Sequence, residues 1–232
     1  MLPSDPLSRD LVWDGTLNVR DLGGHPTLDG RETRFGRIVR ADNIRRLSAE
    51  GLRALADYGI HRIIDLRTDE ELAADPPVDV PVEVFHVPFM DDNEEMFLEA
   101  ERAAFRAPDI AAATREVYLI FLEESLPFVA QVFRMIVEAP EGGVVVHCMG
   151  GKDRTGLTVA FLLRMAGVGL EDIGADYALS EERLRPRHER WFAAAHVLRD
   201  VHARGAPAAE RSHDPHRARP RNRCRARRDR QR

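Results

Sequence analysis

Apolar and polar residues along this chain follow two different periods. Four short runs rich in β-branched residues, each bounded by glycine, proline or charged residues, are typical of strands. These predicted strands cover residues 37–40, 61–66, 82–88 and 143–147. The stretches between them repeat their apolar residues at helical spacing instead. Strands that alternate with helices in this way predict an α/β fold, with a central, mostly parallel sheet flanked by helices.

Three stretches have the spacing of helices. The first follows Ser48, a residue type that commonly caps helix N-termini, and the second covers residues 110–138. We expect the second helix to break near Ser125 and Pro127, because proline lacks the N–H group that a helix interior uses. The third, residues 155–166, is apolar almost all round, which predicts a buried helix. It begins directly after a glycine-rich loop, so its N-terminus should point at that loop.

The chain of 232 residues, 44% of them hydrophobic, is long enough for one substantial domain. The apolar period is lost near Val201, and the rest of the chain has the composition of a disordered segment. We therefore predict a catalytic domain over residues 1–200 and an arginine-rich, disordered tail over residues 201–232. Two explanations of the tail stay open, namely a basic arm that binds an acidic partner and the translation of a shifted reading frame.

Charge is distributed unevenly between these two parts. The tail contains eleven arginines against three carboxylates, so a formal net charge of −5 for the whole chain leaves a strongly acidic domain. An acidic domain argues against nucleic acid as its partner. The sequence also lacks an apolar run of about 20 residues and a signal-peptide pattern at its start, so we expect a cytoplasmic protein without a transmembrane segment.

The chain has only two cysteines, Cys148 at the end of a predicted strand and Cys224 in the tail. A disulfide framework is therefore not expected, and a reactive thiol becomes plausible. A lone cysteine at a strand end is more often a small buried hydrophobic residue. The residues that follow Cys148 favour the reactive thiol over the buried hydrophobic residue.

The segment after the fourth predicted strand has the pattern of a phosphate-binding loop. It reads His147-Cys148-Met149-Gly150-Gly151-Lys152-Asp153-Arg154-Thr155-Gly156. Six positions separate the cysteine from the arginine, which lets backbone N–H groups and a helix N-terminus converge on one tetrahedral anion. The paired glycines permit the tight backbone turn, and the planar arginine fork can hold two phosphate oxygens.

The same surroundings favour the thiolate form of Cys148 at neutral pH. A thiolate can attack phosphorus in line while Arg154 and the N–H groups stabilise the charge on the oxygens, which gives a phosphocysteine that water then hydrolyses. Thr155 is placed to donate its hydroxyl to the sulfur as the sulfur leaves. His147 could fix the loop by bonding a backbone group.

This loop resembles the signature of the bacterial tyrosine and dual-specificity protein phosphatases, a group with mycobacterial and Listeria members. The resemblance covers about residues 15–195, and its further motifs are weak individually but occur in the family's order. They are Asn18-Val19-Arg20-Asp21-Leu22-Gly23-Gly24, Asp65-Leu66-Arg67 and Ala175-Asp176-Tyr177. The resemblance implies the cysteine-phosphatase fold and activity on phosphotyrosine, with phosphoserine, phosphothreonine or phosphoinositides accepted by some members.

A carboxylic acid should protonate the leaving oxygen, and the sequence offers two candidates. Asp153 lies inside the loop, where the resemblance implies a catalytic aspartate, although it could instead brace Lys152 or Arg154. Asp91 and Asp92 follow the third predicted strand, at the sheet edge where α/β sites gather. The alternative for this second pair is a solvated acidic loop.

Lys152, the only lysine in the chain, places a second cation in the loop. It suits a doubly phosphorylated or inositol substrate, or else it serves to stabilise the thiolate. Arg20 and Asp21 are predicted to form a buried structural pair, although next to Gly23-Gly24 they could instead line the edge of the pocket. Arg67 is expected to order the neighbouring loops as the partner of Asp65, although the resemblance also allows it near the site.

His25 and His86 lack companions at metal-ligand spacing, so we infer neither a metal nor a cofactor. Three other functions compete with hydrolysis. A rhodanese-type sulfurtransferase does not require the arginine-threonine-glycine entry to the helix, and an arsenate reductase would need a resolving cysteine. A catalytically silent phospho-ligand-binding module would typically lack the cysteine or the arginine, and this chain retains both.

Overall fold

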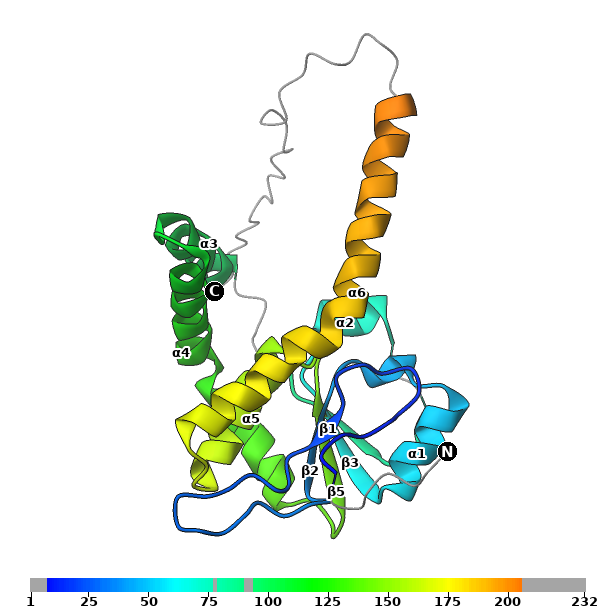
Figure 1. Cartoon of the computed structure of the whole chain (residues 1–232), viewed down its shortest axis with the longest axis vertical. Helices are drawn as coiled ribbons and strands as arrows, with labels where there is room; N and C mark the ends of the chain where they lie inside the picture. Colours follow the sequence, from blue (N-terminus) through cyan, green and yellow to red (C-terminus); the bar gives the residue numbers. More distant parts are fainter. Residues whose placement is uncertain (1–7, 77–78, 90–93, 206–232) are drawn as a thin grey trace, which may run out of the picture. The chain divides into compact units, whose positions relative to one another are not determined.

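The computed structural model describes residues 8–76, 79–89 and 94–205. A five-stranded sheet with strand order β1-β2-β5-β3-β4 forms its centre, with helices on both faces (Figure 1). The strands are β1 (Arg20–Asp21), β2 (Ile38–Ala41), β3 (Ile60–Asp65), β4 (Glu83–His86) and β5 (Gly143–His147). Only β1 runs antiparallel to its neighbour, so the predicted mostly parallel α/β sheet is confirmed.

The four predicted strands are present with ends that shift by a residue or two, and β5 has the predicted bounds. All five residues of β5 are buried, because it lies between β2 and β3 and is covered on both faces. Val145 packs with the residues of one face, whereas Val144 and Val146 pack on the other, as the two-residue period of a strand requires. A short apolar run in mid-sheet therefore fixes the position of the loop that follows it.

The helices cover the two faces of this sheet unequally. Their bounds are α1 (Ala49–Asp57), α2 (Asp69–Ala74), α3 (Glu94–Arg106), α4 (Ile110–Val137), α5 (Asp153–Met165) and α6 (Leu170–Gly205), with a 3₁₀ turn η1 at Ile44–Arg46. The first helix packs through Leu55 on the Val145 face. The other face is covered by α4, through Val129 and Val132, and by α5.

The expected break near Ser125 and Pro127 is wrong, because α4 runs without interruption through both residues. A proline removes one main-chain hydrogen bond, and here the burial of neighbouring Val129 and Val132 against the sheet compensates for that loss. The predicted buried helix is present as α5, which begins two residues earlier than expected, at Asp153. It is buried along one side, whereas Met165 at its end is 73% exposed.

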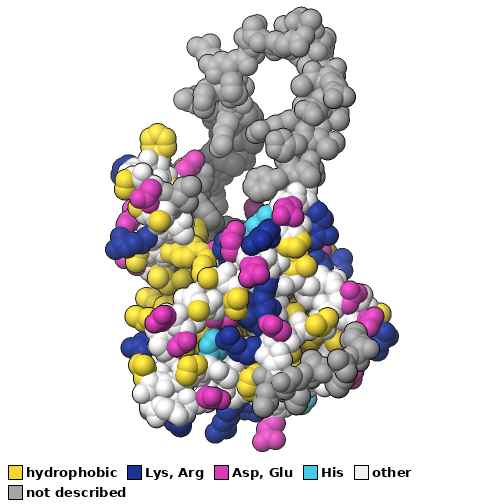
Figure 2. Space-filling model, viewed as in Figure 1, with side chains coloured by type: hydrophobic (Ala, Val, Ile, Leu, Met, Phe, Trp, Pro, Cys, Tyr) yellow, Lys and Arg dark blue, Asp and Glu magenta, His cyan; other side chains and the backbone are white. Residues whose placement is uncertain are grey.

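Two compact units divide the chain, one up to Pro186 and one from Arg187. The predicted domain boundary near residue 200 falls inside α6. Most of the arginine-rich tail lies outside the described residues, so its predicted disorder stays a prediction. No helix in the described ranges is long and apolar enough to cross a bilayer. On the face in Figure 2, acidic and basic side chains are interspersed, and hydrophobic side chains gather along α3 and α4.

Candidate active site

The loop between β5 and α5 lies at the carboxyl edge of the sheet. His147 ends the strand, Cys148 follows it with 2% of its surface exposed, and Asp153 begins the helix. In open parallel sheets, ligands bind outside the carboxyl ends of central strands. The cysteine is therefore placed where such a fold positions its chemistry.

Three consecutive carbonyl oxygens of this loop, those of residues 149–151, are held from outside it. The first accepts a hydrogen bond from the Asn43 N–H at 3.3 Å. Asn18 Nδ2 donates to the next two, at 3.0 and 3.1 Å, and Arg40 Nη2 donates to the last at 2.7 Å. All three donors are buried, so the loop's outer surface is fixed by the body of the protein.

The opposite side of the same peptides presents N–H groups. Because the C=O of one residue and the N–H of the next point in opposite directions, fixing those carbonyls turns the N–H groups of residues 150–152 into the loop. These N–H groups make no hydrogen bond to another described residue. Lys152, the N-cap of α5, likewise gives no side-chain bond to the first helical turn. This arrangement of N–H groups has the geometry of a cradle for one anion.

Gly151 allows the loop to approach the sheet closely. Its φ is +63°, a conformation that favours glycine, and a Cβ there would lie 2.3 Å from the Ala41 carbonyl oxygen at the end of β2. Any side chain would therefore collide with backbone. Of the two neighbouring glycines, Gly151 is the one whose lack of a side chain the structure requires.

Arg154 is held in place by Glu71 on α2. Its Nη2 lies 2.8 Å from Glu71 Oε1, and its Nη1 makes a short contact with Oε2. Burial lowers the pKa of Arg154, but the bond to Glu71 and the neighbouring Cys148 raise it more, so the pKa lies above its ordinary value. A guanidinium has five N–H groups, and the two used here leave three for a phosphate.

Thr155 and His147, the two residues predicted to support the cysteine and the loop, are both buried. The Thr155 hydroxyl has no hydrogen-bond partner among the described residues. Buried hydroxyls are rarely left unsatisfied, so this one is available as a donor inside the site. His147 Nδ1 lies 3.4 Å from the Cys148 carbonyl oxygen, and burial lowers the pKa of His147, which makes it neutral at pH 7.

The Lys152 side chain forms an ion pair with the carboxylate of Glu181. Its Nζ lies 2.5 Å from Glu181 Oε2 on α6, and this bond raises the pKa of the lysine. Asp153 bonds neither Lys152 nor Arg154 and instead accepts hydrogen bonds from Tyr118 and Tyr177. The bracing of a loop cation that was considered for Asp153 is therefore wrong.

A buried ionic cluster lies behind the loop. Asp176 on α6 bonds Arg20 Nε at 2.8 Å and Arg40 Nη1 at 2.5 Å, and Ser180 lies within 3.3 Å of both guanidinium groups. Burial and the charge of Arg40 lower the pKa of Arg20 to about 10, so it remains a cation at neutral pH. Two cations thus face one carboxylate directly behind the anion cradle.

The predicted pair of Arg20 and Asp21 is wrong, although both residues are fully buried. Adjacent residues of a strand point to opposite faces, so the two side chains diverge. Asp21 instead accepts hydrogen bonds from the Gly23 and Gly36 N–H groups and from the Tyr58 hydroxyl. It orders the turns next to β1.

Arg67 has the structural contacts expected of it. Its Nη2 lies 2.7 Å from Asp65 Oδ2, and its Nη1 donates to the Asp75 carbonyl oxygen at 2.8 Å. These bonds tie the end of β3 to the end of α2. Asp91 and Asp92, the other predicted acids, lie outside the described residues.

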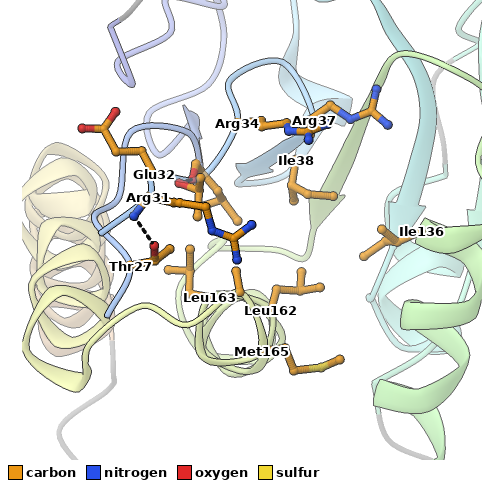
Figure 3. Close-up of a pocket in the computed structure, with 13 residues that line it drawn as sticks. Thr27, Arg31, Glu32, Arg34, Arg37, Ile38, Ile136, Leu162, Leu163 and Met165 are labelled. Atoms are coloured by element: carbon orange, nitrogen blue, oxygen red, sulfur yellow. Dashed lines mark hydrogen bonds between the residues drawn. The ribbon is translucent and has the colours of Figure 1, made fainter. Parts of the chain in front are cut away.

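No group of three histidine, cysteine or carboxylate side chains in the described ranges is arranged to hold a metal ion. A separate cavity of about 500 Å³ lies near the opposite end of α5, where Ile38, Leu162, Leu163 and Arg31 are among the residues that line it (Figure 3). It contains no residue of the loop 147–156. The cavity is therefore distinct from the candidate active site.

Sequence reasoning missed several residues that support the loop. Asn18 lies in the first family-like motif, but the sequence offered no reason to assign it a function. Nothing in the sequence around Tyr118 indicates that it contacts the loop. Arg40 is a charged residue inside an apolar strand run, which could have marked it as a buried partner. Glu71 lies three residues after Thr68, a capping-box spacing that indicates a helix start but not the contact with Arg154.

The fold and this loop together define an architecture of the cysteine-dependent phosphatases: a buried cysteine after a central parallel strand, an N–H-lined cradle, and an arginine six positions on. The comparisons agree with this class. The tyrosine phosphatase family matches residues 11–225, and the chain belongs to that family.

Three curated relatives illustrate the likeness. A tyrosine-protein phosphatase of Nostoc commune is 36% identical over 150 residues, which are 63% of this chain and 49% of the relative. The triple specificity protein phosphatase PtpB of Mycobacterium tuberculosis is 30% identical over 191 residues, 72% of this chain and 68% of the relative. A Cupriavidus necator protein, provisionally named a tyrosine-protein phosphatase, is 30% identical over 180 residues, 75% of this chain and 64% of the relative. The chain thus spans about half to two thirds of the length of these relatives.

Proposed function

We propose that this protein hydrolyses phosphate monoesters, with phosphotyrosine as its first substrate class, through a phosphocysteine intermediate. One observation supports this most strongly: Asn18 and Arg40 hold the carbonyl oxygens of the loop after Cys148, which leaves the loop's N–H groups to face the other way, and Glu71 holds Arg154. A cradle of this kind is complementary to a phosphoryl group whose oxygens gain charge in the transition state.

The reaction has two steps. In the first, Cys148 Sγ attacks phosphorus, the bond from phosphorus to the leaving oxygen breaks, and that oxygen takes a proton from Asp153. In the second, water attacks the phosphocysteine, gives a proton to Asp153, and the sulfur–phosphorus bond breaks. Thr155, with its unpartnered buried hydroxyl, donates to the sulfur as it leaves. The products are the alcohol or phenol, then orthophosphate and the restored thiolate.

Substrate choice is a finer proposal. The names of the relatives include a tyrosine-protein phosphatase and a triple specificity phosphatase, which supports phosphotyrosine first and leaves phosphoserine, phosphothreonine and phosphoinositides as competing substrates. Lys152 would assist a second phosphate group only if such a substrate displaced Glu181 from it. A doubly phosphorylated substrate should then respond to Lys152→Met more than a singly phosphorylated one.

The test measures phosphate release from a phosphotyrosine peptide, a phosphoserine peptide and a phosphoinositide, side by side and without added metal. Cys148→Ser should lower turnover by at least about 10³-fold, because the nucleophile is lost. Cys224→Ser removes the chain's other cysteine and is the matched control, which should retain wild-type turnover. Trapping of a phosphorylated Cys148 by rapid acid quench and mass spectrometry would support the intermediate. Binding of phosphopeptide without turnover by the wild type would favour a silent binding module instead.

A further inference from the structure

Three side chains from three helices meet beside the loop. Tyr118 comes from the N-terminal third of α4, Asp153 is the first residue of α5, and Tyr177 comes from α6. The Tyr118 hydroxyl makes a short hydrogen bond to Asp153 Oδ1, and the Tyr177 hydroxyl lies 3.1 Å from the same oxygen. The two hydroxyl oxygens are 2.5 Å apart, and the rings meet edge to face at 6.5 Å.

The two oxygens of Asp153 are treated differently in this cluster. Oδ1 lies within hydrogen-bond distance of both phenols, which fixes the rotation of the carboxyl group. Oδ2 makes no hydrogen bond to another described residue. Asp153 is an exposed residue, and Oδ2 is its oxygen without a partner among the described residues, so Oδ2 is the oxygen left to exchange a proton.

The number of protons in the cluster fits both states of the carboxyl group. Two phenolic protons serve three contacts when Asp153 is ionised: Tyr118 donates to Oδ1, and Tyr177 donates either to Oδ1 or to the Tyr118 oxygen. A proton added to Oδ2 leaves these bonds in place. Burial raises the pKa of both tyrosines, and the bond to Asp153 raises that of Tyr118 further, so both hydroxyls remain donors at neutral pH.

Tyr177 is itself fixed against the start of α5. A Cβ at Gly156 would lie 2.8 Å from the Tyr177 ring, so only glycine at that position lets the ring pack so closely. The Tyr177 hydroxyl on α6 therefore reaches Asp153 while its ring packs closely against Gly156, and Asp153 and Gly156 both belong to α5. Tyr118 reaches the same oxygen independently, from α4.

We propose that Tyr118 and Tyr177 are positioning residues that hold Asp153 by Oδ1 and leave Oδ2 to transfer the proton in both steps of the reaction. The proposal rests on the phosphatase function above. Removing one donor should let the carboxyl group rotate, so that Oδ2 is less often aligned with the leaving oxygen and kcat falls.

The experiment compares pH–rate profiles of wild type, Tyr118→Phe and Tyr177→Phe on a phosphotyrosine peptide. In either variant kcat should fall by about tenfold across the profile while KM changes much less, because the carboxyl group is no longer held in its productive orientation. Tyr58→Phe is the matched control, because its hydroxyl also donates to a carboxylate, Asp21, at 2.7 Å but away from the loop. It should leave the profile in place.

A double-variant comparison separates positioning from general stability. In an Asp153→Asn background, Tyr118→Phe should have no further effect on the profile or on kcat. The proposal is overturned if Tyr118→Phe and Tyr58→Phe give the same profile, or if the effect of Tyr118→Phe persists without Asp153. Should Tyr118→Phe fail to fold, Tyr177→Phe provides the same test. Absence of Cys148-dependent turnover in the wild type would instead reject the phosphatase function, and this role with it.

Discussion

At the scale of single residues, the charged groups around the loop are held by specific partners. Arg154 is fixed by Glu71, Lys152 by Glu181 and Asp153 by two tyrosines. A guanidinium that is already oriented loses less freedom when it binds phosphate than a mobile one does. The partners of the loop residues therefore matter to activity as much as the loop residues themselves.

Glu71→Gln should lower kcat/KM by about tenfold to a hundredfold, because the neutral amide no longer fixes the arginine that positions phosphate. Glutamine can still accept the Thr68 N–H bond that caps α2, now made by Glu71 at 2.9 Å. The free energy of unfolding should therefore change much less than activity. Steady-state kinetics and urea unfolding on the same preparation check both parts.

Glu70→Gln is the control for this prediction, since Glu70 is the exposed neighbour on the same helix. It should leave kcat/KM within about twofold of wild type. Equal losses in the two variants would show that the charge of α2, rather than its contact with Arg154, is what matters.

At the scale of elements, the loop depends on β2 as well as on β5 and α5. Ala41 approaches the loop so closely that Gly151 cannot have a side chain, and Arg40 donates to the Gly151 carbonyl oxygen from the same strand. This contact joins β2 to the loop that follows β5, and these two strands are neighbours in the sheet but distant in sequence. The shape of the cradle is thus set by packing between elements.

Gly151→Ala should abolish most of the activity and lower the free energy of unfolding by more than the strain of φ alone. A non-glycine residue at positive φ costs about 1–2 kcal/mol, and the clash with the Ala41 carbonyl adds to it. Gly30→Ala is the matched control, because its φ is +81° and nothing lies within 4 Å of its Cβ position. Denaturant unfolding and turnover of both variants test this. Equal destabilisation would show that the close approach to β2 is not required.

At the scale of the whole compact unit, the cluster of Arg20, Arg40 and Asp176 joins segments from both ends of it. Strand β1, strand β2 and helix α6 meet there behind the loop, and all three side chains are buried. Removing a buried carboxylate that lies between two cations strongly destabilises a protein, because the two positive charges are then buried without a negative charge beside them. The cluster of Arg20, Arg40 and Asp176 therefore contributes both to the position of the loop and to the stability of the fold.

Asp176→Asn should lower the free energy of unfolding at pH 7 by about 3–5 kcal/mol. Burial raises the pKa of Asp176, but Arg40 and Arg20 lower it more, so the folded value lies below the ordinary 3.8. A carboxylate whose pKa is lower in the folded state than in the unfolded state stabilises the fold at pH values above its unfolded-state pKa. That stabilisation is lost as the pH falls toward and through its folded-state pKa. The gap between variant and wild type should therefore narrow below about pH 4.

Urea unfolding at a series of pH values measures this gap. Asp172→Asn, one turn earlier on α6 and outside the cluster, should show no such pH-dependent deficit. A deficit in Asp176→Asn that is equally large at pH 3 and pH 7 would contradict the electrostatic explanation and indicate a packing defect instead.

The sequence by itself determined the four parallel strands, the helices α1, α4 and α5, and the loop with its cysteine and arginine, because these depend on local period, spacing and residue type. It did not predict β1, α2 or α3. Only the tertiary structure decided which side chains meet. Arg20 pairs with Asp176 and not with its neighbour Asp21, and Tyr118 reaches Asp153 from a separate helix. Such contacts join residues 35 to 156 positions apart. No local period encodes them, since they arise only when the elements pack.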